Sequence, residues 1–162
     1  MQPTLTQIST PSTLSFLTYS LAIGLAKEAS AQSVPSFVYI SAAAGAPVLP
    51  SRYISTKREA ESTIATTFPR MRSIFIRAPF MYDASRSFTV PLAALTGMGA
   101  IANSLVGGKL TWLMGAGVTK PLKADLVGEA VVEALEDESV QGPLEVKEIE
   151  TLGMRAWRKA ML

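Results

Sequence analysis

The chain has 162 residues and a formal net charge of +2, and it contains neither cysteine nor histidine. The missing cysteines exclude disulfide bonds and thiolate metal sites, and the missing histidines remove the commonest metal ligand and proton carrier, so metalloenzymes and serine–histidine hydrolases are excluded. With so small a net charge and no basic cluster among aromatic residues, nucleic-acid binding is not indicated. The length and the apolar content of 48% fit one domain with a sizeable core.

The N-terminal part of the chain carries no charged residue before Lys27. Residues 1–13 are rich in Thr, Ser and Pro, which predicts a loose lead-in. The apolar run that follows lacks the positive flank of a secretory signal and the arginines of a mitochondrial presequence, so we expect no targeting segment. Its leucines recur at helical spacing, which predicts a helix over Thr18–Gln32 packed on a sheet.

The segment Ser36–Ala42 organises the rest of the chain. Its residues, SFVYISA, are mostly apolar and are β-branched or aromatic, and Pro35 precedes them. This pattern predicts a parallel strand that is buried on both faces. A loop with one glycine and two prolines follows, and a helix is expected to begin at Ser51 and to continue toward Phe68.

Three polar side chains are expected to converge at the carboxyl end of this strand. Tyr53 and Lys57 are four residues apart on the helix and therefore project from the same side. Ser41 ends the strand, where open α/β sheets place their ligands. A nearby ammonium favours the phenolate of a tyrosine, and a serine hydroxyl can polarise a substrate oxygen, so the trio fits proton transfer coupled to hydride transfer. The plainer alternative is a half-buried tyrosine beside a solvated lysine.

The same helix and the strand after it complete a parallel unit. Arg58, Glu59 and Glu61 are expected on the solvated face of the helix. Ser73–Pro79 predicts a second buried parallel strand, reached by a crossover helix. Arg77, near its end, is expected either to line a ligand site or to form an ion pair at the strand end.

The middle of the chain contains a long uncharged stretch. Residues 87–108 are apolar but are interrupted by proline and glycine, which makes a membrane-spanning helix a poor interpretation. The ordinary reading is a core helix with a loop, and the alternative is an apolar wall for a hydrophobic ligand or a membrane-surface face. Gly107-Gly108 and Gly115-x-Gly117 bracket Lys109–Met114, which predicts a short strand or hairpin arm. Neither Gly97-x-Gly99 nor Gly115-x-Gly117 forms a dinucleotide-binding fingerprint.

The last part of the chain predicts a helix, a strand and a second helix. Leu122–Leu135 carries an apolar stripe at helical spacing, and Asp125 is expected to cap its start. Pro143–Ile149 predicts an edge strand. Thr151–Leu162 predicts a short basic amphipathic helix, which either docks on the domain or contacts a membrane surface.

Several of these motifs together resemble a known family. FVYISA, Tyr53-x-x-x-Lys57 and RSIFIRAPFMYD are similar to the second half of an extended or atypical short-chain dehydrogenase/reductase. The segment SAAAGAPVLPSRYISTKREAE resembles a fungal mitochondrial branch of this family, the NAD(P)-binding proteins associated with coenzyme Q (ubiquinone) biosynthesis. The resemblance covers about residues 14–150.

The resemblance implies a fold and a site. The fold would be α/β, the C-terminal part of a Rossmann-like, doubly wound and mostly parallel sheet with flanking helices. Residues 1–162 would form a single, partial NAD(P)-binding domain in which residues 84–120 cover the substrate. The catalytic residues would be Ser41, Tyr53 and Lys57. NAD or NADP would be held by Tyr53, Lys57, Ala78, Pro79 and Phe80.

The glycine-rich first half of such a domain is not present before residue 36, which leaves two functional hypotheses. The first is an NAD(P)-dependent oxidoreductase of mitochondrial ubiquinone biosynthesis with a hydrophobic, quinone-like ligand. The second is a non-catalytic binding or assembly component of a mitochondrial quinone-synthesis or respiratory complex. Peripheral membrane association is compatible with both. The strand Ser36–Ala42 is also expected to have an unpaired edge, which invites a partner.

Overall fold

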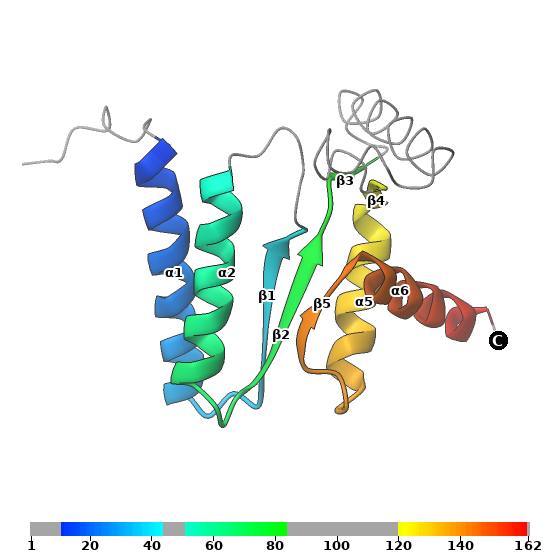
Figure 1. Cartoon of the computed structure of the whole chain (residues 1–162). Helices are drawn as coiled ribbons and strands as arrows, with labels where there is room; N and C mark the ends of the chain where they lie inside the picture. Colours follow the sequence, from blue (N-terminus) through cyan, green and yellow to red (C-terminus); the bar gives the residue numbers. More distant parts are fainter. Residues whose placement is uncertain (1–10, 44–50, 84–119, 162) are drawn as a thin grey trace, which may run out of the picture.

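A computed structural model describes residues 11–43, 51–83 and 120–161 of the chain (Figure 1). In chain order, the elements in these ranges are α1 (Pro11–Ala31), β1 (Ser36–Ala42), α2 (Ser51–Thr67), β2 (Arg72–Ala78), β3 (Met81–Tyr82), β4 (Leu122–Lys123), α5 (Ala124–Glu136), β5 (Gly142–Leu144) and α6 (Val146–Ala160). None of the described helices is long and apolar enough to cross a membrane.

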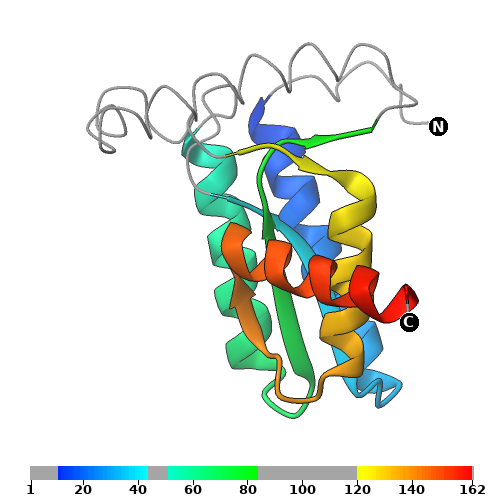
Figure 2. The same ribbon diagram turned by 90° about the vertical axis from the view of Figure 1, so that its right-hand side faces the viewer.

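A three-stranded parallel sheet in the order β1-β2-β5 forms the centre of the described structure. The β1–β2 register runs from Ser36 opposite Arg72 to Ala42 opposite Ala78. Helices α1 and α2 cover one face of this sheet and α5 and α6 cover the other, as Figures 1 and 2 show. The short strands β3 and β4 form a separate parallel pair. The α/β class and the parallel pairing predicted from the sequence are therefore confirmed.

Alternating side chains of β2 feed two separate cores. Ile74 and Ile76 are fully buried against α5 and α6, and Phe75 between them is buried against α1 and α2. A strand turns successive side chains to opposite faces, so a strand that is covered on both faces must be apolar throughout. This explains why RSIFIRA shows no alternation of apolar and polar residues in its centre.

Strand β1 is less buried than the sequence indicates. Ser36 to Tyr39 are half-buried and the side chain of Ile40 is 40% exposed, so the prediction of burial on both faces is wrong for this residue. The reason is position: β1 hydrogen-bonds β2 on one side and no strand of the described residues on the other. The even-numbered side chains therefore lie at the margin of the α5–α6 layer.

The boundaries of the outer elements differ from the predictions. Helix α1 begins at Pro11, a residue favoured in the first turn, and not at the expected Thr18. Asp125 does not cap α5: the capping position is Lys123, and Asp125 lies inside the first turn, where a carboxylate interacts favourably with the helix dipole. Strand β5 has only three residues because a capping box formed by Glu145 and Glu148 starts α6 directly after it.

The expectations for residues 87–108 and for Lys109–Met114 lie outside the described residues, as does nearly all of the segment 84–120 expected to cover a substrate. The expectation of a single domain is likewise untested and stays a prediction.

Candidate functional site

The three residues predicted to be catalytic lie at the α2–β1 contact. Ser41 is the penultimate residue of β1 and is buried, Tyr53 lies in the first turn of α2 and is half-buried, and Lys57 is buried one turn later. The structure brings Tyr53 and Lys57 together, with the Lys57 Nζ 5.7 Å from the centre of the Tyr53 ring. The Ser41 hydroxyl accepts a hydrogen bond from Arg58 Nη1 at 3.2 Å. Tyr53 and Lys57 are therefore neighbours, and Ser41 is held by the arginine that follows Lys57.

Lys57 lies between two aromatic rings. Its Nζ is 4.5 Å from the centre of the Tyr39 ring, and it donates a hydrogen bond of 2.9 Å to the carbonyl oxygen of Ile40. Burial lowers the pKa of Lys57, because a buried ammonium loses its hydration, and the charge of Glu61 opposes part of this shift. The plainer alternative from the sequence, a solvated lysine, is thus wrong for this pair.

Tyr39 belongs to the same cluster, and the sequence reasoning missed it. Its hydroxyl is buried and has no hydrogen-bond partner in the part of the chain that the structure describes. Burial, with smaller contributions from Tyr53 and Glu61, raises the pKa of Tyr39 to about 12. The signal was available: in β1, positions 39 and 41 must face the same side of the sheet, so a tyrosine at 39 necessarily shares the α2 face with Ser41.

A buried carboxylate connects this cluster to β2. Glu61 is 4% exposed and accepts from Arg58 Nη1 at 2.6 Å and from Arg77 Nη2 at 2.6 Å. Arg77 also pairs with Glu145 at 2.6 Å. Burial alone would raise the pKa of Glu61, but the hydrogen bonds from Arg77 and Ser41 and the charges of both arginines hold that pKa below its usual value. The prediction that Glu61 and Arg58 lie on a solvated face is therefore wrong, and the alternative of an ion pair for Arg77 is confirmed.

The side chains of Lys57 and Arg58 in α2 cover the C-terminal end of β1 on its outer edge, the edge that faces away from β2. The carbonyl of Pro35 accepts a hydrogen bond from the Arg72 amide, and the amide of Ala43 donates one to the carbonyl of Ala78. Because backbone groups alternate in direction along a strand, the amides and carbonyls of odd-numbered residues in β1 face β2, and those of even-numbered residues face outward. Lys57 Nζ binds the outward carbonyl of Ile40, and Arg58 Nη2 binds that of Ala42 at 2.8 Å. Lys57 and Arg58 therefore anchor α2 to the sheet edge.

The residues predicted to contact a cofactor form the end of β2 and the turn after it. Ala78 and Pro79 are buried and Phe80 is half-buried. The carbonyl of Ala78 accepts from the Ala43 amide at 2.8 Å, and that of Phe80 accepts from the Leu122 amide at 3.0 Å. These contacts tie the turn to β1 and β4. The catalytic and cofactor-binding roles assigned above are not tested by this geometry and stay predictions.

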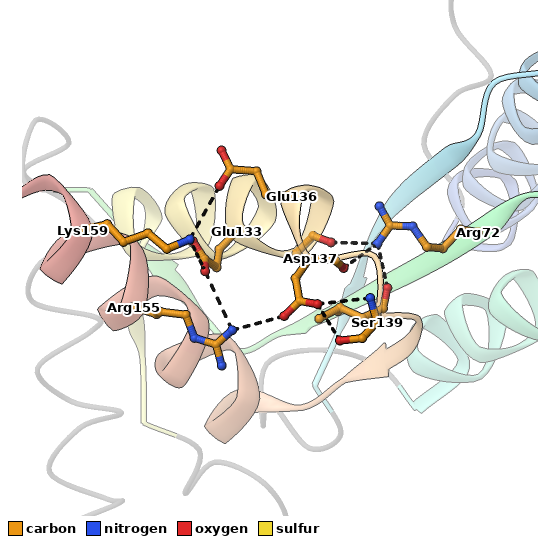
Figure 3. A network of polar contacts seen from close by, with 9 residues as sticks. Arg72, Glu133, Glu136, Asp137, Ser139, Arg155 and Lys159 are labelled. Atoms are coloured by element: carbon orange, nitrogen blue, oxygen red, sulfur yellow. Dashed lines mark hydrogen bonds and ion pairs between the residues drawn. The ribbon is translucent and has the colours of Figure 1, made fainter.

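A second polar cluster lies at the opposite end of the sheet (Figure 3). The Arg72 guanidinium donates to four backbone carbonyls at and beyond the C-terminal end of α5, those of Ala134, Leu135, Asp137 and Val140, over 2.8–3.0 Å. On the far side of α5, the buried Glu133 carboxylate accepts from Lys159 Nζ at 2.8 Å, which attaches α6. All of these contacts join elements of this chain, so the cluster has a structural role.

One cavity of about 280 Å³ lies in the α5–α6 layer, away from Tyr53 and Lys57. It is lined by Lys123, Asp125, Leu126, Glu129 and Met154.

Comparisons with known proteins include a partial match to a curated protein. No family model matches the chain, and no solved structure matches it. The chain is 42% identical over 65 residues to a curated protein of Saccharomyces cerevisiae named MIOREX complex component 2. The matched stretch is 40% of this chain and 24% of that protein, so the chain spans about a quarter of the length of the relative it matches.

These findings correct the family resemblance drawn from the sequence. No family model supports a short-chain dehydrogenase/reductase or an NAD(P)-binding Rossmann assignment, and the chain is similar over part of its length to a MIOREX complex component. The expectations of an oxidoreductase and of ubiquinone biosynthesis are corrected with it. In this structure Lys57 of the Tyr-x-x-x-Lys motif donates to the carbonyl of Ile40 and so fastens α2 to β1. The comparisons thus relate this chain, in part of its length, to a component of a protein complex.

Proposed function

We propose that this chain is a non-catalytic binding or assembly component of a mitochondrial protein complex. The observation that carries the proposal is the 42% identity over 65 residues to a protein named as a component of the MIOREX complex. The same similarity supports the mitochondrial location that the family resemblance implied.

The polar groups of the candidate site support a structural role. Lys57 donates to a backbone carbonyl, Arg58 donates to both Ser41 and Ala42, and Glu61 accepts from two arginines. A catalytic group has to be available to a substrate, whereas these groups are used in fastening α2 to β1 and β2. The arrangement therefore fits a rigid scaffold that presents its surface to other proteins.

The proposal is tested by isolating the tagged chain from the mitochondria of its own cells under native conditions and measuring the size of the particle that contains it. We expect a particle much larger than the 17.3 kDa chain. Tyr53→Phe removes the hydroxyl that acid–base chemistry would need, and we expect this variant to support the cellular function and the assembly as well as the natural chain does.

Two results would contradict the proposal. Recovery of the chain only as a free monomer would remove the assembly role. Loss of cellular function in Tyr53→Phe, with the particle still intact, would indicate chemistry at the Tyr53 hydroxyl.

A further inference from the structure

Helix α6 is fixed to the domain in two different ways along its length. In its first half, Ile149 and Leu152 are buried in the core that α5 and α6 share with the sheet. Gly153 lies directly against α5, because a Cβ atom at this position would be 2.6 Å from the backbone oxygen of Leu126. Apolar packing therefore holds α6 as far as Gly153.

The second half of α6 has no apolar anchor among its described side chains. Each of those between residues 154 and 161 is half-buried or exposed, and Met154 and Met161 are 47% and 68% exposed. The C-terminal end of this half projects past α5 (Figures 1 and 2). Among the described side chains, the contacts that hold this half of the helix are ionic.

The ionic contacts meet at one buried carboxylate of α5 (Figure 3). Both oxygens of Glu133 accept hydrogen bonds from Lys159 Nζ, at 2.8 and 2.9 Å. The Arg155 guanidinium lies 3.8 Å from the same carboxylate and binds Asp137 at 3.2 Å. The side chains of Lys159 and Arg155 are 58% and 49% exposed, so the contact joins a buried anion to cations that reach solvent.

We infer that residues 155–161 form a strap that opens from α5 and closes on it while the rest of the domain stays folded, and that the charge of Lys159 controls it. Opening returns the Glu133 carboxylate to water, and closing buries it again against the ammonium. The pivot is Gly153, where the apolar packing ends. The strap is a property of this fold and does not depend on the proposed assembly role.

The control by Lys159 follows from the cost of burying a charge. A carboxylate loses its hydration when it is buried, and this cost is offset only if a cation compensates the charge. Without the charge of Lys159, the closed strap would bury Glu133 with only the more distant Arg155 to compensate it. The open arrangement avoids this cost, so the loss of one charge shifts the equilibrium toward the open strap and leaves the rest of the domain folded.

Amide hydrogen exchange at single-residue resolution, on the full chain, measures the opening. A free segment this short does not stay helical, so opening unwinds it and its amides exchange. Lys159→Gln removes the charge, whereas Lys159→Arg keeps it. Glu136→Gln is the matched control, because the exposed Glu136 carboxylate also lies near Lys159 Nζ, at 3.8 Å. Circular dichroism checks that each variant folds.

We expect Lys159→Gln to speed the exchange of the amides of residues 157–160 by about tenfold or more, and to leave the amides of α5 and β2 unchanged. Lys159→Arg and Glu136→Gln should change these rates by less than about twofold. Adding Glu133→Gln to Lys159→Gln should restore most of the protection, since the closed strap then buries no charge. Such a recovery separates the strap from the ordinary fraying of a helix end, which does not depend on Glu133.

Three results would overturn the inference. Unchanged exchange in Lys159→Gln would mean that this charge does not hold the end of α6. Exchange that rises equally in α5 and β2 would mean that the domain opens as one unit and has no separate strap. Equal acceleration in Lys159→Gln and in the double variant would mean that the buried charge of Glu133 is not what opens the helix end.

Discussion

The Arg77 guanidinium holds the Glu61 carboxylate with two nitrogens, Nη2 at 2.6 Å and Nε at 3.1 Å from Oε2. The pair joins β2 to α2 across the layer boundary, and Arg58 adds a third charged hydrogen bond from the helix itself. A carboxylate that is 4% exposed is stable only when its charge is compensated in this way. The strength of this contact can be measured directly.

Glu61→Gln should destabilise the fold by about 2–3 kcal/mol at neutral pH, because two arginines lose their carboxylate partner. The folded-state pKa of Glu61 lies below its unfolded value, so its contribution is complete above the ordinary glutamate pKa of about 4.3 and is lost as pH falls through the folded-state value. Urea unfolding at pH 7 and at pH 3 should show a difference between variant and natural chain that shrinks in acid. The exposed Glu59→Gln is the control, and an equal effect of both would refute the assignment.

Tyr39→Phe should leave stability unchanged or raise it by up to about 1 kcal/mol, because it removes a buried hydroxyl that has no partner among the described residues. Tyr19→Phe is the matched comparison, since the Tyr19 hydroxyl bonds Thr63 at 3.1 Å, and it should cost about 0.5–1.5 kcal/mol. Thermal unfolding of the two variants measures the contrast. A larger loss in Tyr39→Phe would mean that this hydroxyl has a function in the cluster.

Arg72→Lys should destabilise the protein by about 2–3 kcal/mol, although the charge is kept. The planar guanidinium binds four carbonyls and the Ser36 hydroxyl, and an ammonium has three donors on one atom and cannot reach all of them. Urea unfolding should show this loss, with Arg70→Lys in the exposed turn before β2 as the neutral control. Equal stability of the two variants would show that the carbonyls at the end of α5 accept hydrogen bonds from water when the guanidinium is absent.

Gly153→Ala should destabilise the α5–α6 contact by about 1–3 kcal/mol, because its new methyl group would lie 2.6 Å from the backbone oxygen of Leu126. Gly128→Ala, on the exposed side of α5, meets no atom within 4 Å and should stabilise the helix by about 0.5–1 kcal/mol. Opposite signs in thermal unfolding are the expected result. Two stabilising substitutions would mean that α6 moves easily on α5.

Ser33→Gly should stabilise the protein by about 0.5–1 kcal/mol. Ser33 follows α1 with a φ of 57°, a left-handed conformation that costs a serine more than a glycine. Ser30→Gly, inside the last turn of α1, should instead destabilise by about 0.5–1 kcal/mol because it lowers helix propensity. The unfolding midpoints in urea of the two variants should therefore shift in opposite directions.

Much of the local structure was predictable. The strand Ser36–Ala42 has the predicted bounds, and the helix from Ser51 ends one residue before the expected Phe68. The second strand begins one residue earlier than Ser73. Each of these segments is marked by its own residues, through β-branched runs, proline boundaries and helical spacing. The bounds of these strands and helices are set by residues close in the sequence, so they can be predicted without knowledge of tertiary contacts.

The candidate site was only partly predictable. The spacing of Tyr53 and Lys57 on one helix places them side by side, and the structure confirms it. The partners of Lys57 and the burial of Glu61 were missed, because they depend on how α2 lies against the edge of β1. From sequence alone, a charged residue on a helix is predicted to face solvent, and only the tertiary structure shows which element covers it.

The sequence by itself determined the α/β class, the parallel β1–β2 pair and, to within about one residue, the bounds of β1, α2 and β2, because periodicity and proline boundaries are properties of short segments. Only the tertiary structure decided that Lys57 and Arg58 bind the outward carbonyls at the end of β1, that Arg72 binds the carbonyls at the end of α5, and that Leu21 and Leu25 stay exposed. These outcomes depend on which backbone carbonyls lie within reach of a side chain from another element. Such distances are set when the layers pack together, and no local pattern records them.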